Sequence, residues 1–305
     1  MKKLNTETRK VIASLRHCVI AFGYLFGTVH FSSSYSIAQE TWTIRFDPKE
    51  PAQGQTLKIE LKNAPSKANI FIRFRNKTYP LYAITEEGAR KRALIGVAGD
   101  CPAGNYSLEL YQKGFLRKLK LWEKMVTVAG KEFPKETIEL KKEKTSLIED
   151  IQGTVGTKKI RQKLKELSPK QLWRDAFVLP AQGRETSVYG IRRVINNDIP
   201  WNFHKGLDLA APEGTPVYAP NDGEVVLAET LTLQGNCVLL NHGQGIYSIY
   251  MHLSKILARP GQQLKKGDLL GNVGSTGIAT AAHLHWGIYI NGDAVDPTEW
   301  LNRKF

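Results

Sequence analysis

Cysteine is scarce in this 305-residue chain, which contains Cys18, Cys101 and Cys237 and no Cys-x-x-Cys pair. Zinc ribbons and thiol–disulfide redox sites need that spacing, so neither kind of site is predicted. Cys18 lies in a segment that we expect to be removed, and the other two cysteines fall in different predicted domains. A disulfide between Cys101 and Cys237 would require an oxidising compartment. We expect two buried free thiols instead.

The chain also lacks an apolar run as long as a transmembrane helix, which needs about 20 residues. Its first apolar run extends from Cys18 to about Phe31 and is followed by Ser36-Ile37-Ala38. A basic start, a short apolar stretch and small residues before a cut site are typical of an export signal. We therefore expect residues 1–38 to be a cleaved signal peptide of a periplasmic or secreted protein, with a retained N-terminal membrane anchor as the alternative. The basic residues that precede the run are Lys2, Lys3, Arg9, Lys10 and Arg16.

Acidic residues are fewer than basic ones, 29 against 43, which gives a formal net charge of +14. Without residues 1–38, the remaining 38 basic and 28 acidic residues give +10. Such a charge would draw an exported protein toward an anionic wall polymer or membrane surface, and a solvated face is the alternative explanation. The sequence contains no recognised nucleic-acid-binding motif, so nucleic acid is not an expected partner.

Four of the seven histidines fall, with one aspartate, into three short phrases in the last third of the chain. In a strand, residues two or four apart point to the same face, so His204 can meet Asp208, and His283 can meet His285. Imidazole and carboxylate suit a zinc ion, and three protein ligands leave a fourth position for water. With His252 there are five candidate ligands, more than one tetrahedral ion needs, so some of the histidines are candidates for proton transfer. The phrases are H-K-G-L-D (204–208), Y-M-H-L-S (250–254) and H-L-H-W (283–286).

Two other motifs are missing. The chain contains no H-E-x-x-H, so the glutamate base of that class of metal site is absent and an imidazole has to serve as base. The glycine-rich G-S-T-G at Gly274–Gly277 lacks the lysine of a phosphate-binding loop. A wall of backbone along a substrate groove suits this segment better than phosphate binding.

Residues 177–300, about 40 percent of the chain, resemble the lysostaphin-type, LytM-like zinc endopeptidases that cut peptide cross-links in bacterial cell walls. The matching phrases occur in the family's order. They are F-V-L-P-A-Q-G (177–183), V-Y-G-I-R-R (188–193), H-K-G-L-D-L-A-A-P-E-G-T-P-V-Y-A-P (204–220), D-G-E-V-V (222–226), Y-M-H-L-S (250–254), K-K-G-D-L-L-G-N-V-G-S-T-G (265–277) and H-L-H-W (283–286).

This resemblance implies that His204, Asp208 and His285 bind one Zn²⁺ per chain and that His252 and His283 are catalytic histidines beside it. None of the five positions departs from the family pattern. The resemblance therefore implies an endopeptidase that hydrolyses peptide cross-links of peptidoglycan, either glycine bridges or direct D-alanyl cross-links. It also implies a groove above the zinc site, walled by residues 191–203, 229–236 and 274–282.

Two alternatives remain open from the sequence. One is a non-hydrolytic LytM-like regulator that binds and activates a separate cell-wall amidase. The other is a latent enzyme whose N-terminal domain or linker occludes the groove. The chain gives no indication of its oligomeric state.

The expected fold is mainly β, with three parts after the signal segment. Alternating runs such as T-L-K-I-E-L-K (56–62) and I-F-I-R-F (70–74) predict an antiparallel β-sandwich over residues 41–128. It resembles, more loosely, the immunoglobulin-like domain that precedes the peptidase in some family members, and it is expected to position or inhibit the peptidase or to act as a spacer.

The remaining two parts follow this sandwich. Residues 129–176 are predicted to form a short helical linker, because Ile160, Leu164 and Leu167 have helical spacing, and we expect their apolar stripe to pack within the protein. Residues 177–305 are predicted to form the LytM-like antiparallel β domain, with strands at 225–228, 237–240, 246–250 and 284–290.

Overall fold

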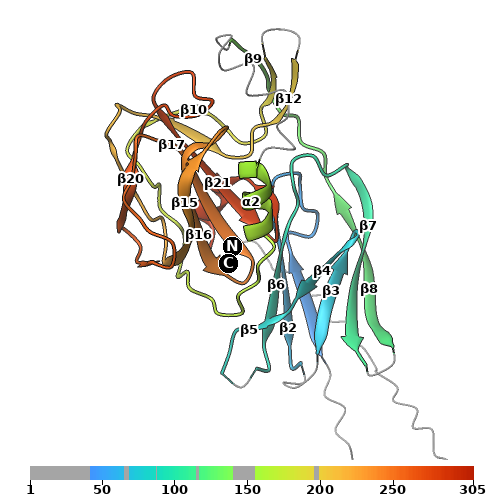
Figure 1. The fold of residues 1–305 in the computed structure, drawn as a ribbon. Coiled ribbons are helices and arrows are strands. Elements are labelled where there is room, and N and C mark those ends of the chain that lie inside the picture. The colour runs from blue at the N-terminus through green and yellow to red at the C-terminus, as the bar shows by residue number, and fades with distance from the viewer. Residues whose placement is uncertain (1–41, 65–68, 87, 115–116, 140–154, 196–198) are drawn as a thin grey trace, which may run out of the picture. The chain divides into compact units, whose positions relative to one another are not determined.

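The computed structural model describes residues 42–64, 69–86, 88–114, 117–139, 155–195 and 199–305 (Figure 1). The predicted signal segment and residues 140–154 of the predicted linker therefore lie outside the described residues. The chain divides into two compact units. One unit consists of the residues up to Arg45 together with Ile59–Arg92 and Ser107–Lys124. The other holds Phe46–Lys58, Ala93–Tyr106 and Met125–Phe305.

Two four-stranded sheets account for the described strands between residues 43 and 128. Buried and less buried side chains alternate along the second and third strands, as expected for sheets with one apolar face. The strands predicted at 56–62 and 70–74 are confirmed, whereas the immunoglobulin-like character of the region stays a prediction. One sheet has the order β1 (Thr43–Asp47), β2 (Thr56–Lys62), β6 (Lys91–Gly96), β5 (Tyr82–Ala83), and the other β4 (Lys77–Pro80), β3 (Ile70–Phe74), β7 (Gly104–Lys113), β8 (Lys118–Val128).

An eight-stranded sheet with antiparallel pairing forms the centre of the second unit. The four strands predicted for the C-terminal domain lie within its members β15, β16, β17 and β21, which confirms them. The strand order is β10 (Arg184–Ser187), β13 (Leu207–Ala210), β21 (His283–Ile290), β17 (Ile246–Leu253), β16 (Gly235–Gly243), β15 (Gly223–Leu231) and β19 (Gln263–Leu264), with β22 (Asp293–Val295) paired to β21. A separate three-stranded sheet has the order β14 (Pro216–Tyr218), β20 (Leu269–Asn272), β18 (Lys255–Ile256).

Both faces of the central sheet are apolar. On β16, Val238 and Leu240 belong to one hydrophobic core, while Cys237 and Leu239 belong to the other. Because side chains alternate across a strand, a strand buried on both faces requires the continuous apolar run seen here. The sheet is therefore held from both sides, which gives a rigid base for residues on its inner strands β13, β21 and β17.

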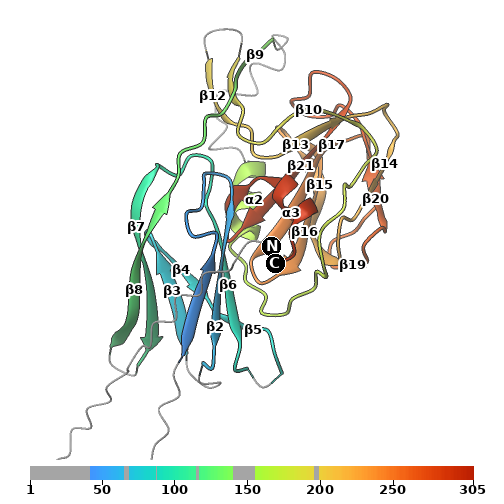
Figure 2. The ribbon, with the colours of Figure 1, turned by 180° about the vertical axis from the view of Figure 1, so that it is seen from behind.

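Helices α2 (Val155–Lys163; Figure 1) and α3 (Pro297–Asn302; Figure 2) contribute to different cores. Ile160 and Leu164 are buried in the core that contains Cys237, and Trp300 is buried in the other. Burying such a side chain contributes about 1.5–3 kcal/mol, so α2 is a firmly packed part of this unit.

The expectation that the linker's apolar stripe packs within the protein is confirmed for Ile160 and Leu164. It is wrong for Leu167, whose side chain is 53% exposed. The helix ends at Lys163, so the helical spacing that relates the three residues in the sequence does not extend to Leu167.

The linker also contains a strand that the sequence analysis does not predict. β9 (Lys135–Ile138) pairs in parallel with β11 (Arg192–Ile195), which pairs with β12 (Ile199–Phe203). The many charged residues of this stretch predict a solvated linker, although the β-branched side chains of Thr137 and Ile138 suit a strand. The pairing places the linker beside the segment that leads to His204.

The two cysteines of the described chain are both buried and free, which confirms the expected thiols. Burial raises the pKa of the Cys237 thiol, so this group is inert at neutral pH. Among the described residues, no helix combines the length and the apolar character needed to cross a membrane.

The fold predicts a pH dependence of stability through His242. Its side chain is fully buried; Nδ1 donates to the Asp222 carbonyl at 2.7 Å and Nε2 accepts from Ser248 at 2.7 Å. Burial lowers the pKa of His242 to about 4, despite an opposing contribution from the Asp222 carbonyl. The unfolded chain has a His pKa of about 6.5, so it takes up a proton first as the pH falls. The neutral His242 side chain therefore contributes its full share of the unfolding free energy above pH ~6.5, and this contribution is lost as the pH falls toward ~4.

We expect wild type to lose roughly 2 kcal/mol more unfolding free energy than His242→Gln between pH 7.5 and 4.5. Urea unfolding of both proteins at the two pH values measures this difference, because the other titrating groups are common to both. Equal losses in the two proteins would show that His242 does not titrate on unfolding.

Candidate metal centre

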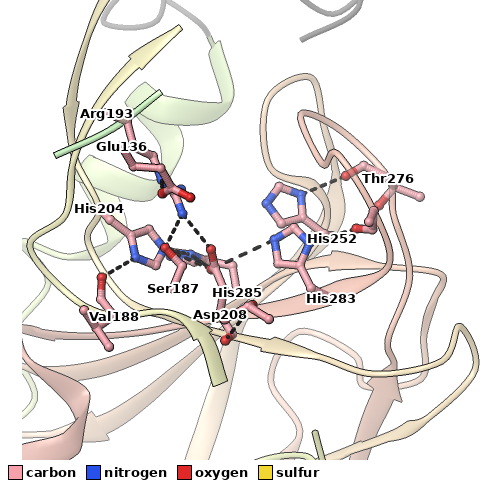
Figure 3. Close-up of polar contacts among 12 residues, drawn as sticks. Glu136, Ser187, Val188, Arg193, His204, Asp208, His252, Thr276, His283 and His285 are labelled. Carbon is pink, nitrogen blue, oxygen red and sulfur yellow. Dashed lines mark hydrogen bonds and ion pairs between the residues drawn. The ribbon is translucent and has the colours of Figure 1, made fainter. Parts of the chain in front are cut away.

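Three potential metal ligands converge beside strands β13 and β21 (Figure 3). Asp208 on β13 lies directly opposite His285 on β21, and His204 lies between β12 and β13. His204 Nε2 is 2.9 Å from Asp208 Oδ1 and 2.9 Å from His285 Nδ1. His285 Nδ1 is also 2.9 Å from Asp208 Oδ1. The expectation that His204 and Asp208 meet by strand periodicity is wrong, because the chain bends between them and the bend brings them together.

The donor atoms of these three residues fit a zinc ion. All of them lie within 4.8 Å of one another, and the three side chains are buried. Ligand atoms at about 2.0–2.2 Å from a tetrahedral ion would be roughly 3.4 Å apart, close to the spacing found here. His204 Nδ1 lies 2.8 Å from the Val188 carbonyl oxygen, which can only accept. The proton of the neutral ring is therefore on Nδ1, and the lone pair of Nε2 points at the other two ligands.

Charge within the centre also suits a cation. Burial on its own would raise the pKa of Asp208, but the hydrogen bonds to His204 and His285 hold that pKa well below its usual value. Burial lowers the pKa of His285 to about 4, although its hydrogen bond to Asp208 acts in the opposite direction. At neutral pH the centre thus offers an ionised carboxylate and an unprotonated imidazole, which are the forms that bind metal.

The two predicted catalytic histidines lie beside this triad. The ring centroids of His252 and His283 are 4.9 Å apart, and His283 Nε2 is 3.9 Å from Asp208 Oδ1. His252 Nδ1 donates to the Thr276 carbonyl at 2.8 Å, and His283 Nδ1 donates to the Ala281 carbonyl at 2.8 Å. In the neutral rings both Nε2 atoms are therefore free to accept a proton, and Figure 3 shows both rings turned toward the triad.

His252 adopts an unusual backbone conformation. Its φ is 64°, in the left-handed region that a residue with a Cβ atom rarely occupies. Its backbone N–H donates to the Gln234 carbonyl at 2.9 Å, which holds the residue in place. Burial, together with the neighbouring His283 and His285, lowers the pKa of His252 to about 3. A strained, neutral imidazole in a cleft is typical of a functional site rather than of core packing.

Arg193, Ser187 and Glu136 also belong to the centre, although no pattern in the sequence indicates them. Arg193 Nη2 donates to Asp208 Oδ2 at 3.0 Å and to Ser187 Oγ, and Arg193 Nε donates to Glu136 Oε2 at 3.3 Å. Arg193 is the last residue of the V-Y-G-I-R-R phrase, so the phrase marks the right segment without indicating this contact. Glu136 comes from β9 and has no local signal.

A cleft of about 770 Å³ contains all five sequence-predicted site residues. Each of the three segments expected to wall a groove contributes to it, with Phe203, Gln234 and Ile278 among the lining residues. Helix α2 and strand β9 also line the cleft, which the sequence did not predict. The centre is thus accessible from a concave surface large enough for a peptide segment.

Residues 202–297 match the model of peptidase family M23. A metalloprotease of uncharacterised function from Haemophilus influenzae is 47% identical over 98 residues, which cover 31% of this chain and 20% of that protein. Peptidoglycan DD-endopeptidase ShyA from Vibrio cholerae is 42% identical over 93 residues, covering 30% of this chain and 22% of that protein. The chain thus spans about a fifth of the length of these curated relatives.

A solved structure named as peptidase M23, from Pseudomonas aeruginosa, is similar over most of the molecule. It has a TM-score of 0.59 and 25% sequence identity, and the match covers 85% of this chain and 97% of that one. The matched residues 202–297 include the whole His204–Asp208–His285 triad and both neighbouring histidines. The C-terminal part of this chain is therefore a LytM-type domain of peptidase family M23.

Proposed function

We propose that this protein is a zinc-dependent endopeptidase that hydrolyses peptide cross-links of bacterial peptidoglycan. The observation that carries the proposal is the convergence of two imidazoles and a carboxylate beside two further imidazoles, each held through Nδ1 by a backbone carbonyl, in a cleft of an M23 domain. A binding module would need the cleft, but it would not need proton-accepting groups beside a metal triad.

His204, Asp208 and His285 would hold the zinc ion through Nε2, Oδ1 and Nδ1. When bound, zinc supplies Lewis-acid polarisation of a carbonyl and lowers the pKa of water toward ~7. The carboxylate of Asp208 offsets part of the metal charge. The position of His204 is fixed by the Val188 carbonyl, so the ligand geometry is prepared by the fold.

His252 and His283 would move the protons of the hydrolysis. One imidazole Nε2 accepts a proton from the attacking water, and a proton is delivered to the nitrogen of the leaving amine as the peptide C–N bond breaks. Both rings donate through Nδ1 to backbone carbonyls, which leaves Nε2 as the atom that exchanges protons. Water adds across the bond, so the products are a carboxylate and an amine.

The substrate assignment is supported by the names of related proteins. ShyA is named a peptidoglycan DD-endopeptidase, and Mpg from Neisseria meningitidis, 41% identical over 97 residues, is named a DD-carboxypeptidase/endopeptidase. These names favour direct D-alanyl cross-links over glycine bridges as the bond that is cut. The non-hydrolytic regulator is less well supported, because such a regulator needs neither a complete triad nor His252 and His283.

Export to the periplasm or the cell exterior is part of this proposal. The predicted signal segment, residues 1–38, is the feature that supports it, because peptidoglycan lies outside the cytoplasmic membrane. A net charge of +10 on the remaining chain would favour contact with anionic wall or membrane surfaces.

Hydrolysis is expected to depend on the zinc ligands and on the two neighbouring histidines. Zinc-loaded wild type is expected to convert cross-linked peptidoglycan dimers to monomers, and both His252→Ala and His285→Ala should lower the rate by about 10²–10⁴-fold. Purified cross-linked peptidoglycan is digested, and the products are separated by chromatography and identified by mass spectrometry. The fragment masses identify the bond that is cut.

A full-length protein that binds zinc but leaves the wall intact should be compared with a chain that starts near Leu172, which lacks the linker. Activity of the shorter chain alone would indicate a latent enzyme. The shorter chain also lacks α2, whose Ile160 is buried in a core, so circular dichroism must first show that it is folded. Absence of activity in the full-length protein and in a folded shorter chain would contradict the proposed hydrolysis and favour the regulator.

The zinc content of the variants distinguishes a metal ligand from a proton carrier. Wild type and His252→Ala should each bind one zinc per chain, whereas His285→Ala should lose zinc on dialysis because one of three ligands is gone. Elemental analysis of dialysed protein measures the metal content. A chelator should abolish the activity of wild type, and added zinc should restore it. Retention of one zinc per chain by His285→Ala would contradict its assignment as a ligand.

A further inference from the structure

The two oxygens of the Asp208 carboxylate have different partners. Oδ1 faces the triad and lies 2.9 Å from His204 Nε2 and 2.9 Å from His285 Nδ1. Oδ2 points away from the triad and accepts a hydrogen bond from Arg193 Nη2 at 3.0 Å. One oxygen is thus available to a metal, and the other is held by a guanidinium (Figure 3).

Arg193 is itself held by groups from two other strands. Its Nη2 also donates to Ser187 Oγ on β10, and its Nε donates to Glu136 Oε2 on β9 at 3.3 Å. The parallel pairing of β9 and β11 places Glu136 directly beside Arg193, and the pairing of β10 with β13 places Ser187 beside Asp208. The guanidinium side chain is only 16% exposed, so it cannot turn freely toward solvent.

We propose that Arg193 is a positioning residue that fixes Asp208 as a one-oxygen zinc ligand, and that Glu136 on β9 holds Arg193 in that position. This inference rests on the proposed function, because it takes zinc as the metal of the site. A carboxylate torsion has a broad energy minimum, so an unrestrained Asp208 could rotate or bind the ion through both oxygens. The rigid guanidinium fork removes that freedom by occupying Oδ2.

The two contacts differ in strength. The Arg193–Asp208 pair is largely buried and is a charge-assisted hydrogen bond, and removing such an outer contact of a metal ligand costs about 10–100-fold in metal affinity. The Glu136 side chain is 42% exposed, so its ion pair with Arg193 is weakened by solvent. Losing Glu136 should therefore weaken zinc binding by only a few-fold.

This arrangement gives the linker a role in the centre. β9 lines the cleft, but its Glu136 reaches the triad through Arg193 and stabilises a ligand. The linker strand thus completes the metal centre, rather than only connecting domains or blocking the groove.

The test measures the zinc dissociation constant of full-length variants by competition with a chelating dye. Arg193→Met should weaken zinc binding about 10–100-fold, and Arg193→Lys, which keeps the charge but not the fork, should fall between it and wild type. Arg192→Met is the matched control. It removes the same charge from the same strand, but the Arg192 guanidinium lies 6.0 Å from the Phe133 ring and its side chain is exposed.

Glu136→Gln tests the second half of the inference. Alone it should weaken zinc binding about two- to five-fold, and in the Arg193→Met background it should have no further effect, because its partner is gone. An equal effect of Glu136→Gln in both backgrounds would show that Glu136 does not act through Arg193. Equal zinc affinity of Arg193→Met and Arg192→Met would overturn the role of Arg193.

Circular dichroism and urea unfolding of the metal-free variants show whether each is folded. If Arg193→Met is unfolded, Arg193→Lys is compared with Arg192→Lys, and equal zinc affinity of these two overturns the proposal. Zinc affinity is measured without peptidoglycan, so the two hypotheses fail separately. A wild type that cuts the wall while Arg193→Met binds zinc normally contradicts only the positioning role. A wall left intact, with the expected order of zinc affinities, contradicts only the proposed hydrolysis.

Discussion

The pairing register of β13 and β21 is the constraint on which the metal centre depends. It places Asp208 directly opposite His285, and a slip by one residue would turn one of the two to the other face of the sheet. The same register pairs buried residues on the opposite face, Leu207 with Trp286 and Leu209 with Leu284. Each such side chain contributes about 1.5–3 kcal/mol when buried. A slip that exposed all four would therefore cost roughly 6 kcal/mol or more, a large part of the stability of a typical domain.

Packing of the hydrophobic core thus determines the path of the backbone, and backbone carbonyls in turn orient three of the imidazoles. His204, His252 and His283 each donate Nδ1 to a main-chain oxygen, from Val188, Thr276 and Ala281 respectively. A carbonyl has no proton to give, so in each neutral ring Nε2 is the atom left to bind or accept. Main-chain acceptors do not titrate and do not change with a side-chain substitution. The tautomers of these three imidazoles are consequently determined by the path of the chain.

Much of this centre could be predicted from the sequence, because its chemistry is concentrated in short phrases. His283 and His285 are two apart on one strand, and strand periodicity places them on one face. The contribution of Arg193 could not be predicted in this way, since an arginine beside an arginine has no distinguishing pattern. Glu136 lies 57 positions from its partner, in a charged stretch that looks like a solvated linker. Its role follows from the parallel pairing of β9 with β11, which depends on the folded chain and not on local spacing.

The glycine in the first phrase illustrates what a motif encodes physically. A Cβ atom on Gly206 would lie 2.4 Å from the Trp286 carbonyl oxygen and 2.8 Å from the His285 ring. Atoms of these kinds cannot approach so closely, and neither the main chain of β21 nor a buried imidazole can move away. The chain can therefore bend between His204 and Asp208, and still pass directly over His285, only because residue 206 has no side chain. The spacing of the two ligands and the glycine between them therefore meet the same requirement. The two backbone segments must approach closely enough for their side chains to bind a single ion.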